Sequence, residues 1–200
     1  NNMPDSFEIL IVGSGLAGLT TALHLADQRR VGIITKRRLL DGASDWAQGG
    51  IAAVLAADDS IEAHVQDTLI AGAGLCDAEV TRHVVSQGRE AIQWLIEQGV
   101  PFTRDADNAT GYHLTREGGH SQRRVIHAAD ATGHAVQTTL VERVKAHPNI
   151  TLFEDHIAID LITDAKLNRP GKRCYGLYAL DKSSGRVLTF SAQHTVLASG

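Results

Sequence analysis

The strongest constraint on the fold is a glycine-rich turn, Gly13-Ser14-Gly15-Leu16-Ala17-Gly18, which lies between an apolar run and a helical repeat. Residues 7–12 are almost continuously apolar, which is typical of a strand buried on both faces of a parallel sheet. Residues 16–28 carry apolar side chains at helical spacing, and a second apolar run begins at residue 31. This order predicts a β-α-β unit with parallel strands and a right-handed crossover.

Each glycine of the motif has a separate role in binding a dinucleotide. Gly13 permits the tight turn, Gly15 lets a pyrophosphate approach the backbone, and Gly18 lets the helix pack close to the strand. The helix N-terminus offers unpaired N–H groups and a positive dipole end to phosphates. A structural glycine-rich turn without a ligand is the alternative, but the β-α-β context favours a dinucleotide site.

The end of the second predicted strand departs from the usual dinucleotide-binding pattern. An acidic residue that binds ribose hydroxyls is expected about 20 residues beyond the turn. This chain has Lys36 there, followed by Arg37 and Arg38. A basic group here suits the 2′-phosphate of adenosine and would indicate NADP. The alternative is that these residues form a solvated basic turn with no role in cofactor binding. The first 40 residues leave NADP and FAD open.

Three further helices are predicted after an irregular, glycine-containing segment at 37–58. Asp59 and Glu62 form a capping box that opens the first helix. Asp77 caps the second helix, which ends near Gly99.

Residues 103–130 are too long and polar for a passive connection, so we interpret them as a functional loop. The last helix covers 132–146. The strands expected after it are Thr151–Phe153, Ile157–Ile162, Tyr175–Leu180, Val187–Phe190 and Thr195–Ala198, with a β-meander over 157–190.

Composition and charge exclude several classes of protein. The 19 basic and 23 acidic residues leave a net charge of −4, which argues against a nucleic-acid binder. No apolar run approaches the roughly 18–20 residues of a membrane span, and no signal peptide is apparent. Cys76 and Cys174, far apart and outside any CxxC motif, fit a reducing cytosol.

No metal site is expected, although four histidines recur every seven residues. Gly118 and Gly119 interrupt any helix that would align them, and no dense His/Cys cluster exists. The four residues are His113, His120, His127 and His134.

Four segments resemble the flavoprotein family of succinate dehydrogenase, fumarate reductase and L-aspartate oxidase. With the turn at 13–18, the stretch Gly42-Ala43-Ser44-Asp45-Trp46-Ala47-Gln48-Gly49-Gly50-Ile51-Ala52-Ala53 resembles the whole family. The stretches Asp67–Gly74 (DTLIAGAG), His113–Ser121 (HLTREGGHS) and Arg124–Gly133 (RVIHAADATG) are similar to its L-aspartate oxidases in particular.

The resemblance implies FAD, bound non-covalently, with Ser14 to Ala17 on the pyrophosphate and Lys36 near the adenosine ribose. Membrane-complex relatives place a histidine that bonds covalently to FAD at the position of Ala43. The residues expected beside the flavin are Ala43, Ser44, Asp45, Trp46, Ala47, Gln48, Gly49 and Gly50.

The resemblance also implies a substrate residue, Glu117, whose carboxylate would orient the α-ammonium group of aspartate. A surface glutamate is the alternative. Arg116, Arg123 and Arg124 could bind substrate carboxylates, but basic loop residues are more often solvated, so we exclude them from the predicted site.

The implied reaction oxidises L-aspartate to iminoaspartate, with oxygen or fumarate as the acceptor, in the first step of de novo NAD synthesis. A functional link to quinolinate synthase and a cytoplasmic location follow from this. Two alternatives stay open: a soluble fumarate reductase flavoprotein and a non-catalytic NADP-binding module.

The fold class expected is α/β: a Rossmann-like FAD-binding domain with a parallel sheet, helices on its faces and the inserted meander. The chain ends at Ser199-Gly200 after an apolar strand, so we expect 1–200 to be an incomplete, N-terminal part of that domain. The substrate-capping domain and the proton-transfer arginine would be absent, and the fragment alone inactive. We interpret Asn1 and Asn2, before Met3, as a cloning remnant.

Overall fold

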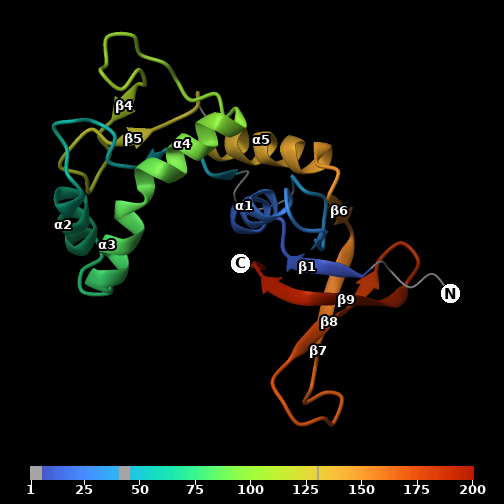
Figure 1. Cartoon of the computed structure of the whole chain (residues 1–200). Helices are drawn as coiled ribbons and strands as arrows, with labels where there is room; N and C mark the ends of the chain where they lie inside the picture. Colours follow the sequence, from blue (N-terminus) through green and yellow to red (C-terminus); the bar gives the residue numbers. More distant parts are fainter. Residues whose placement is uncertain (1–5, 41–45, 130) are drawn as a thin grey trace. The chain divides into compact units, whose positions relative to one another are not determined.

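The computed structural model describes residues 6–40, 46–129 and 131–200 (Figure 1). The chain divides into two compact units, of which the first contains residues 1–45 and 140–200 and the second contains residues 46–139. Each unit has its own sheet. The predicted α/β class is confirmed.

The first unit is built on a six-stranded mixed sheet in the order β6-β2-β1-β9-β8-β7. The three pairings β6–β2, β2–β1 and β1–β9 are parallel, so the carboxyl ends of these four strands meet at one edge. The strands are β1 (Phe7–Val12), β2 (Val31–Ile34), β6 (Ile150–Phe153), β7 (His156–Thr163), β8 (Cys174–Asp181) and β9 (Arg186–Leu197).

The predicted meander is confirmed, but it extends the parallel sheet through one long strand. The prediction of two separate strands at Val187–Phe190 and Thr195–Ala198 is wrong, because β9 continues through both. Its first half pairs antiparallel with β8, and its second half pairs parallel with β1. The polar stretch between Phe190 and Thr195 marks the change of partner, not a turn.

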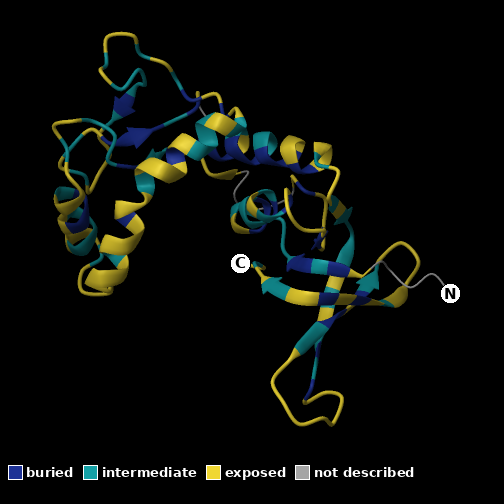
Figure 2. Ribbon diagram, in the orientation of Figure 1, coloured by how far each residue is buried: buried dark blue, intermediate teal, exposed yellow. Residues whose placement is uncertain are grey.

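Aromatic rings fill the core of this sheet. The Phe153 ring lies 4.8 Å from that of Phe190 and 5.8 Å from that of Phe7, both in edge-to-face geometry. Phe7 and Phe190 are buried together with Leu10 and Leu177. In Figure 2, most of β1 is buried, whereas buried and exposed residues alternate along β9. The shared core packing holds β1 in the sheet between β2 and β9.

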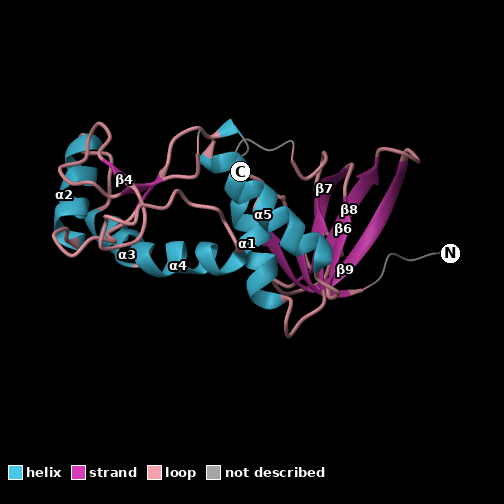
Figure 3. Cartoon of the chain, turned by 90° about the horizontal axis from the view of Figure 1, so that it is seen from above, coloured by secondary structure: helices cyan, strands magenta, loops and turns pink. Residues whose placement is uncertain are grey.

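Helix α1 (Leu16–Leu25) packs against β1 and β2 and ends three residues before the predicted limit at residue 28 (Figure 3). A side chain at Gly18 would overlap the carbonyl oxygen of Gly13, so this glycine is needed for the close helix–strand contact. Leu19 and Ala22 bury the face of α1 that meets the sheet.

The second unit combines helices with a small antiparallel sheet in the order β3-β5-β4. The strands are β3 (Ile51–Ala52), β4 (Leu114–Thr115) and β5 (Val125–Ile126). The helices are α2 (Ile61–Ala71), α3 (Ala78–Ser86) and α4 (Gly88–Gln98), followed by α5 (Thr132–Ala146), within which the division between the units falls.

Two predicted helix features are wrong in detail. The Asp59 capping box does not form: the side chain of Ser60 caps α2 by accepting a hydrogen bond from the Ala63 amide. The helix capped by Asp77 is two helices, α3 and α4, which meet at Gln87. Gly88, the first residue of α4, has low helix propensity, which favours a break at this point.

Other boundaries agree with the sequence. Asp77 accepts a hydrogen bond from the Val80 amide as an N-cap, and Gly99 ends α4 in the left-handed conformation. Helix α5 matches its predicted range. Across 6–40, 46–129 and 131–200, no helix has the length and apolar character needed to cross a bilayer.

We expect Gly13→Ala to destabilise the protein by more than about 3 kcal/mol or to prevent folding. Gly13 has φ +112°, and a Cβ there would overlap the carbonyl of Ala198, the residue after β9. Gly15→Ala is the matched control, because no atom of the described residues, beyond its chain neighbours, lies within 4 Å of the added Cβ. Urea unfolding monitored by circular dichroism measures both, and equal destabilisation would contradict the assignment.

Candidate cofactor and substrate site

The glycine turn lies at the edge where the carboxyl ends of the parallel strands meet. The Gly13 amide donates to the carbonyl of Ile34 at 2.9 Å, and the Ala198 amide donates to that of Val12 at 2.8 Å. The first contact joins the turn to the end of β2, and the second joins the end of β1 to the end of β9. The backbone of the turn is therefore held from both sides.

The start of α1 is compatible with a bound diphosphate. Gly15 is the N-cap of α1, and no side chain there caps the helix. In the part of the chain that the structure describes, an added Cβ at Gly15 would meet no atom within 4 Å beyond its chain neighbours, whereas Gly13 and Gly18 face backbone. The Ser14 hydroxyl is tied to that of Thr35 at 2.8 Å, part-buried at the end of β2. The residues present thus leave the helix N-terminus open to an anion.

Lys36 is exposed just beyond β2, at the same edge of the sheet. Its backbone carbonyl accepts a hydrogen bond from Lys182 Nζ at 3.2 Å, while its side chain extends into solvent. The position suits the adenosine end of a dinucleotide bound at the turn, because it follows the strand next to β1. The role of Lys36 stays a prediction.

The predicted flavin-side segment is only partly described. Ala43, Ser44 and Asp45 lie outside the described residues. In the second unit, Trp46 is 81% exposed, and Ala47, Gln48 and Gly49 are also exposed.

The two glycines of this segment differ in what they face. Gly49 faces open space, but a side chain at Gly50 would overlap the Ile126 carbonyl on β5. Packing on β5 therefore explains the glycine at position 50, whereas Gly49 alone leaves room for a flat ring.

Glu117 lies in the hairpin loop between β4 and β5. The hairpin is closed by the pairs Leu114–Ile126 and Thr115–Val125. The carbonyl of Glu117 accepts a hydrogen bond from the His120 amide at 3.2 Å, which makes a tight turn with Gly119 at φ +84°. The Glu117 side chain is exposed, so it is available to a ligand.

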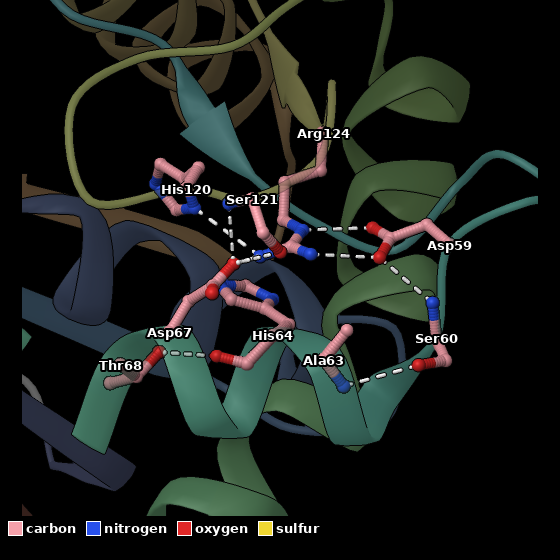
Figure 4. Close-up of polar contacts among 9 residues, drawn as sticks. All are labelled: Asp59, Ser60, Ala63, His64, Asp67, Thr68, His120, Ser121 and Arg124. Atoms are coloured by element: carbon pink, nitrogen blue, oxygen red, sulfur yellow. Dashed lines mark hydrogen bonds and ion pairs between the residues drawn. The ribbon is translucent and has the colours of Figure 1, made fainter. Parts of the chain in front are cut away.

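The same loop ends in a buried ion-pair network, drawn in Figure 4. Arg124 has no exposed side-chain surface, and its Nε and Nη2 each donate to a different carboxylate oxygen of Asp59 at 2.8 Å. Its Nη1 donates to Asp67 Oδ2 at 2.6 Å. That oxygen also accepts from the amide and the hydroxyl of Ser121, at 2.7 and 2.8 Å.

These contacts shift the pKa values of all three charged groups. The Ser121 amide, with its hydroxyl and Arg124, lowers the pKa of Asp67 to about 2. Burial, the largest single effect, raises the pKa of Asp59, but the bonds and charge of Arg124 and the bond from the Ser60 amide together outweigh it, so the net shift is downward. The bonds to Asp59 raise the pKa of Arg124. The network is therefore fully ionised at neutral pH.

The three arginines that were excluded from the predicted site differ in burial and in surroundings. Arg124 is buried and fully paired, so it is not available to a substrate. Arg116 and Arg123 instead line a polar cleft of about 550 Å³, together with Asp58 and Asn108.

Sequence reasoning missed the partnership of Asp59, Asp67 and Arg124. The signal available was that Asp67 and Arg124 each begin one of the segments that carry the family resemblance.

The histidines do not form a metal-binding group. His113 Nδ1 lies 2.8 Å from His127 Nε2, a hydrogen-bonded pair next to β4 and β5. His120 lies against Arg124 and His64. Among the residues with described positions, no three His, Cys, Asp or Glu side chains are arranged to hold a metal ion.

Comparisons with known proteins point in one direction. The family model described as "FAD binding domain" matches residues 8–200. The chain is 69% identical to L-aspartate oxidase 1 of Ralstonia nicotianae over 195 residues, which is 98% of this chain and 37% of that protein. It is 54% identical to L-aspartate oxidase of Pseudomonas aeruginosa over 198 residues, which is 96% of this chain and 37% of that protein. The chain therefore spans little more than a third of these relatives.

Among solved structures, the FrdA chain of an E. coli quinol fumarate reductase superimposes with a TM-score of 0.88 at 29% identity. The match covers 98% of this chain and 33% of that one.

We expect the stability of the protein to fall between pH 4 and pH 2 in a manner that depends on Asp67. A carboxylate with a lowered native pKa contributes stability above its unfolded pKa and loses it as the pH falls through the native value. With a native pKa of about 2, Asp67 contributes about 2 kcal/mol. Urea unfolding at pH 5, 4, 3 and 2 measures it.

Asp67→Asn should show a smaller loss of stability over this pH range than the unchanged protein, and Ser121→Ala an intermediate one. Identical pH dependence in all three proteins would contradict the assignment.

Proposed function

Because the chain belongs to the FAD binding domain family, we propose that it forms the cofactor-binding part of an enzyme that oxidises L-aspartate to iminoaspartate. Oxygen or fumarate would accept the electrons. The 69% identity to a named L-aspartate oxidase, over 98% of the chain, is the observation that carries this proposal. The open helix N-terminus at Gly15 supports it, because FAD requires a diphosphate site.

In this proposal, the backbone amides of Ser14 to Ala17 bind the diphosphate, and Lys36 lies near the adenosine ribose. Ala47 to Gly50 lie beside the flavin, where Gly49 leaves room for the ring. Ala43 has no group that could form a covalent bond to it, so the cofactor is held non-covalently. When bound, FAD supplies a two-electron acceptor for the hydride that leaves the substrate Cα.

Glu117 orients the substrate. Its exposed carboxylate is a natural partner for the α-ammonium group of aspartate, since charge-assisted hydrogen bonds are short and strong. Orienting the substrate in this way lowers the entropic part of the barrier to hydride transfer. In this proposal, the segment 103–130, which contains the β4–β5 hairpin and Glu117, is the functional segment of the second unit.

The role proposed for the whole protein is the first step of de novo NAD synthesis in the cytoplasm. Its product would pass to quinolinate synthase. These statements concern a protein of the relatives' full length, of which the chain spans little more than a third.

A second candidate is a soluble fumarate reductase, favoured by the TM-score of 0.88 to a quinol fumarate reductase chain. Glu117 discriminates between the two functions. An ammonium group needs an anionic partner, whereas fumarate has only carboxylates, which a glutamate repels.

We expect Glu117→Gln to raise the KM for L-aspartate at least tenfold in the full-length protein, because a charged hydrogen bond to the ammonium group is lost. The KM for fumarate should stay the same or fall. Steady-state assays of peroxide release and of reductant-driven fumarate turnover measure the two substrates.

Glu142→Gln is the matched control, since Glu142 is an exposed glutamate on α5. An unchanged KM for aspartate in Glu117→Gln would contradict the role of Glu117. A colourless protein that binds NADPH and refuses FAD would overturn the whole proposal in favour of an NADP-binding module.

A further inference from the structure

We propose that Asp67 is a positioning residue that fixes Glu117 through Ser121. This inference rests on the proposed function, because it gives Asp67 and Ser121 a part in recognising the ammonium group of the substrate. Neither residue touches that group in the proposal. They hold the loop that presents the carboxylate.

The contacts that hold Ser121 on α2, here called the anchor, meet at one oxygen atom of Asp67. Asp67 Oδ2 accepts three hydrogen bonds, from the Ser121 amide, the Ser121 hydroxyl and Arg124 Nη1, all between 2.6 and 2.8 Å. The Asp67 side chain is 13% exposed. Charge-assisted bonds in such a partly dry site are about twice as strong as neutral ones, so Ser121 is held at a defined point on α2.

Arg124 makes the position of Asp67 itself rigid. The guanidinium binds Asp59 side-on just before the N-cap of α2 and binds Asp67 two turns further along. Two carboxylates of one helical segment are thus joined to the residue that directly precedes β5. The far end of the hairpin loop cannot shift along the helix without breaking a buried ion pair.

Only a short stretch separates this anchor from Glu117. The loop leaves β4 after Thr115, which is paired with Val125, and returns to the anchor at Ser121. Between them, the hydrogen bond from the His120 amide to the Glu117 carbonyl closes a turn. The Glu117 backbone is therefore restrained by the strand on one side and by a turn that leads directly to Ser121 on the other.

A network that only stabilises the fold and a network that positions Glu117 lead to different expected effects of its removal. If the network only stabilised the second unit, its loss would lower stability without changing the preference between substrates. If it positions Glu117, its loss weakens binding of a dicarboxylate that carries an ammonium group and spares one that does not. The contrast between L-aspartate and fumarate therefore isolates the positioning role.

The test uses Ser121→Ala and Asp67→Asn in the full-length protein loaded with FAD. Ser121→Ala removes one bond and leaves the buried charges intact, so it should fold even where Asp67→Asn does not. We expect the KM for L-aspartate to rise about fivefold in Ser121→Ala and further in Asp67→Asn, with the KM for fumarate unchanged. Glu62→Gln is the control, because Glu62 lies on α2 like Asp67 and its exposed ion pair is with Arg82 on α3, outside the network.

A second readout does not depend on turnover. Hydrogen exchange of the amides of Gly118 to Ser121, in protein without substrate, should be faster in Ser121→Ala than in the unchanged protein and in Glu62→Gln. Combining Ser121→Ala with Glu117→Gln should raise the KM for aspartate no further than Glu117→Gln alone, because both changes act on the same contact.

The outcomes separate this inference from the proposed function. An unchanged KM for aspartate in Glu117→Gln overturns the role of Glu117 and this inference with it. A raised KM in Glu117→Gln, with normal KM values in Ser121→Ala and Asp67→Asn, overturns the inference alone. Additive effects in the double variant, or equal losses for aspartate and fumarate, also overturn it.

Discussion

The first unit depends on the close backbone packing at the end of β1. Gly13 turns the chain at φ +112° in a space where any side chain would overlap the carbonyl of Ala198, and its amide is bonded to the end of β2. The turn is therefore fixed by its two neighbouring strands before any ligand is bound. Pre-organised amides bind an anion without a further ordering cost, which is why this geometry suits a diphosphate.

In the second unit, buried ion pairs hold the loop between β4 and β5 in place. Its sheet consists of three strands of two residues each, so strand pairing alone is a weak support for the long loop between β4 and β5. The buried guanidinium of Arg124 joins that loop to α2 through two carboxylates. The cost of desolvating three charges offsets much of their attraction, so we expect the network to serve mainly to define one conformation of the loop.

Sequence patterns predicted the parts of the structure that local chemistry decides. The glycine turn, the Asp77 cap, the Gly99 terminus and the meander all follow from neighbouring residues. The errors arose where a distant partner decides the outcome. Asp59 looked like a helix cap, but Arg124, 65 residues away, takes its carboxylate, so Ser60 caps α2. Likewise, the polar residues 191–194 predicted a break between two strands. The strand continues through them because β1 pairs with the second half of β9. The roles of Glu117, Lys36 and the segment Ala43–Gly50 come from resemblance. Glu117, Lys36 and Trp46 to Gly49 are exposed, and exposed residues leave no trace of their ligand in packing.

The central claim is that the amides opening α1 hold the diphosphate of FAD, with Gly15 as the point of closest approach. The most direct measurement is the dissociation constant of FAD in the full-length protein, by quenching of flavin fluorescence, for the unchanged chain and for Gly15→Ala. Among the described residues, no atom outside the chain neighbours of Gly15 lies within 4 Å of the added methyl group, so we expect its main effect on what lies in front of the turn. We expect the dissociation constant of FAD to rise at least tenfold in a normally folded Gly15→Ala variant. Unchanged affinity in that variant would contradict it.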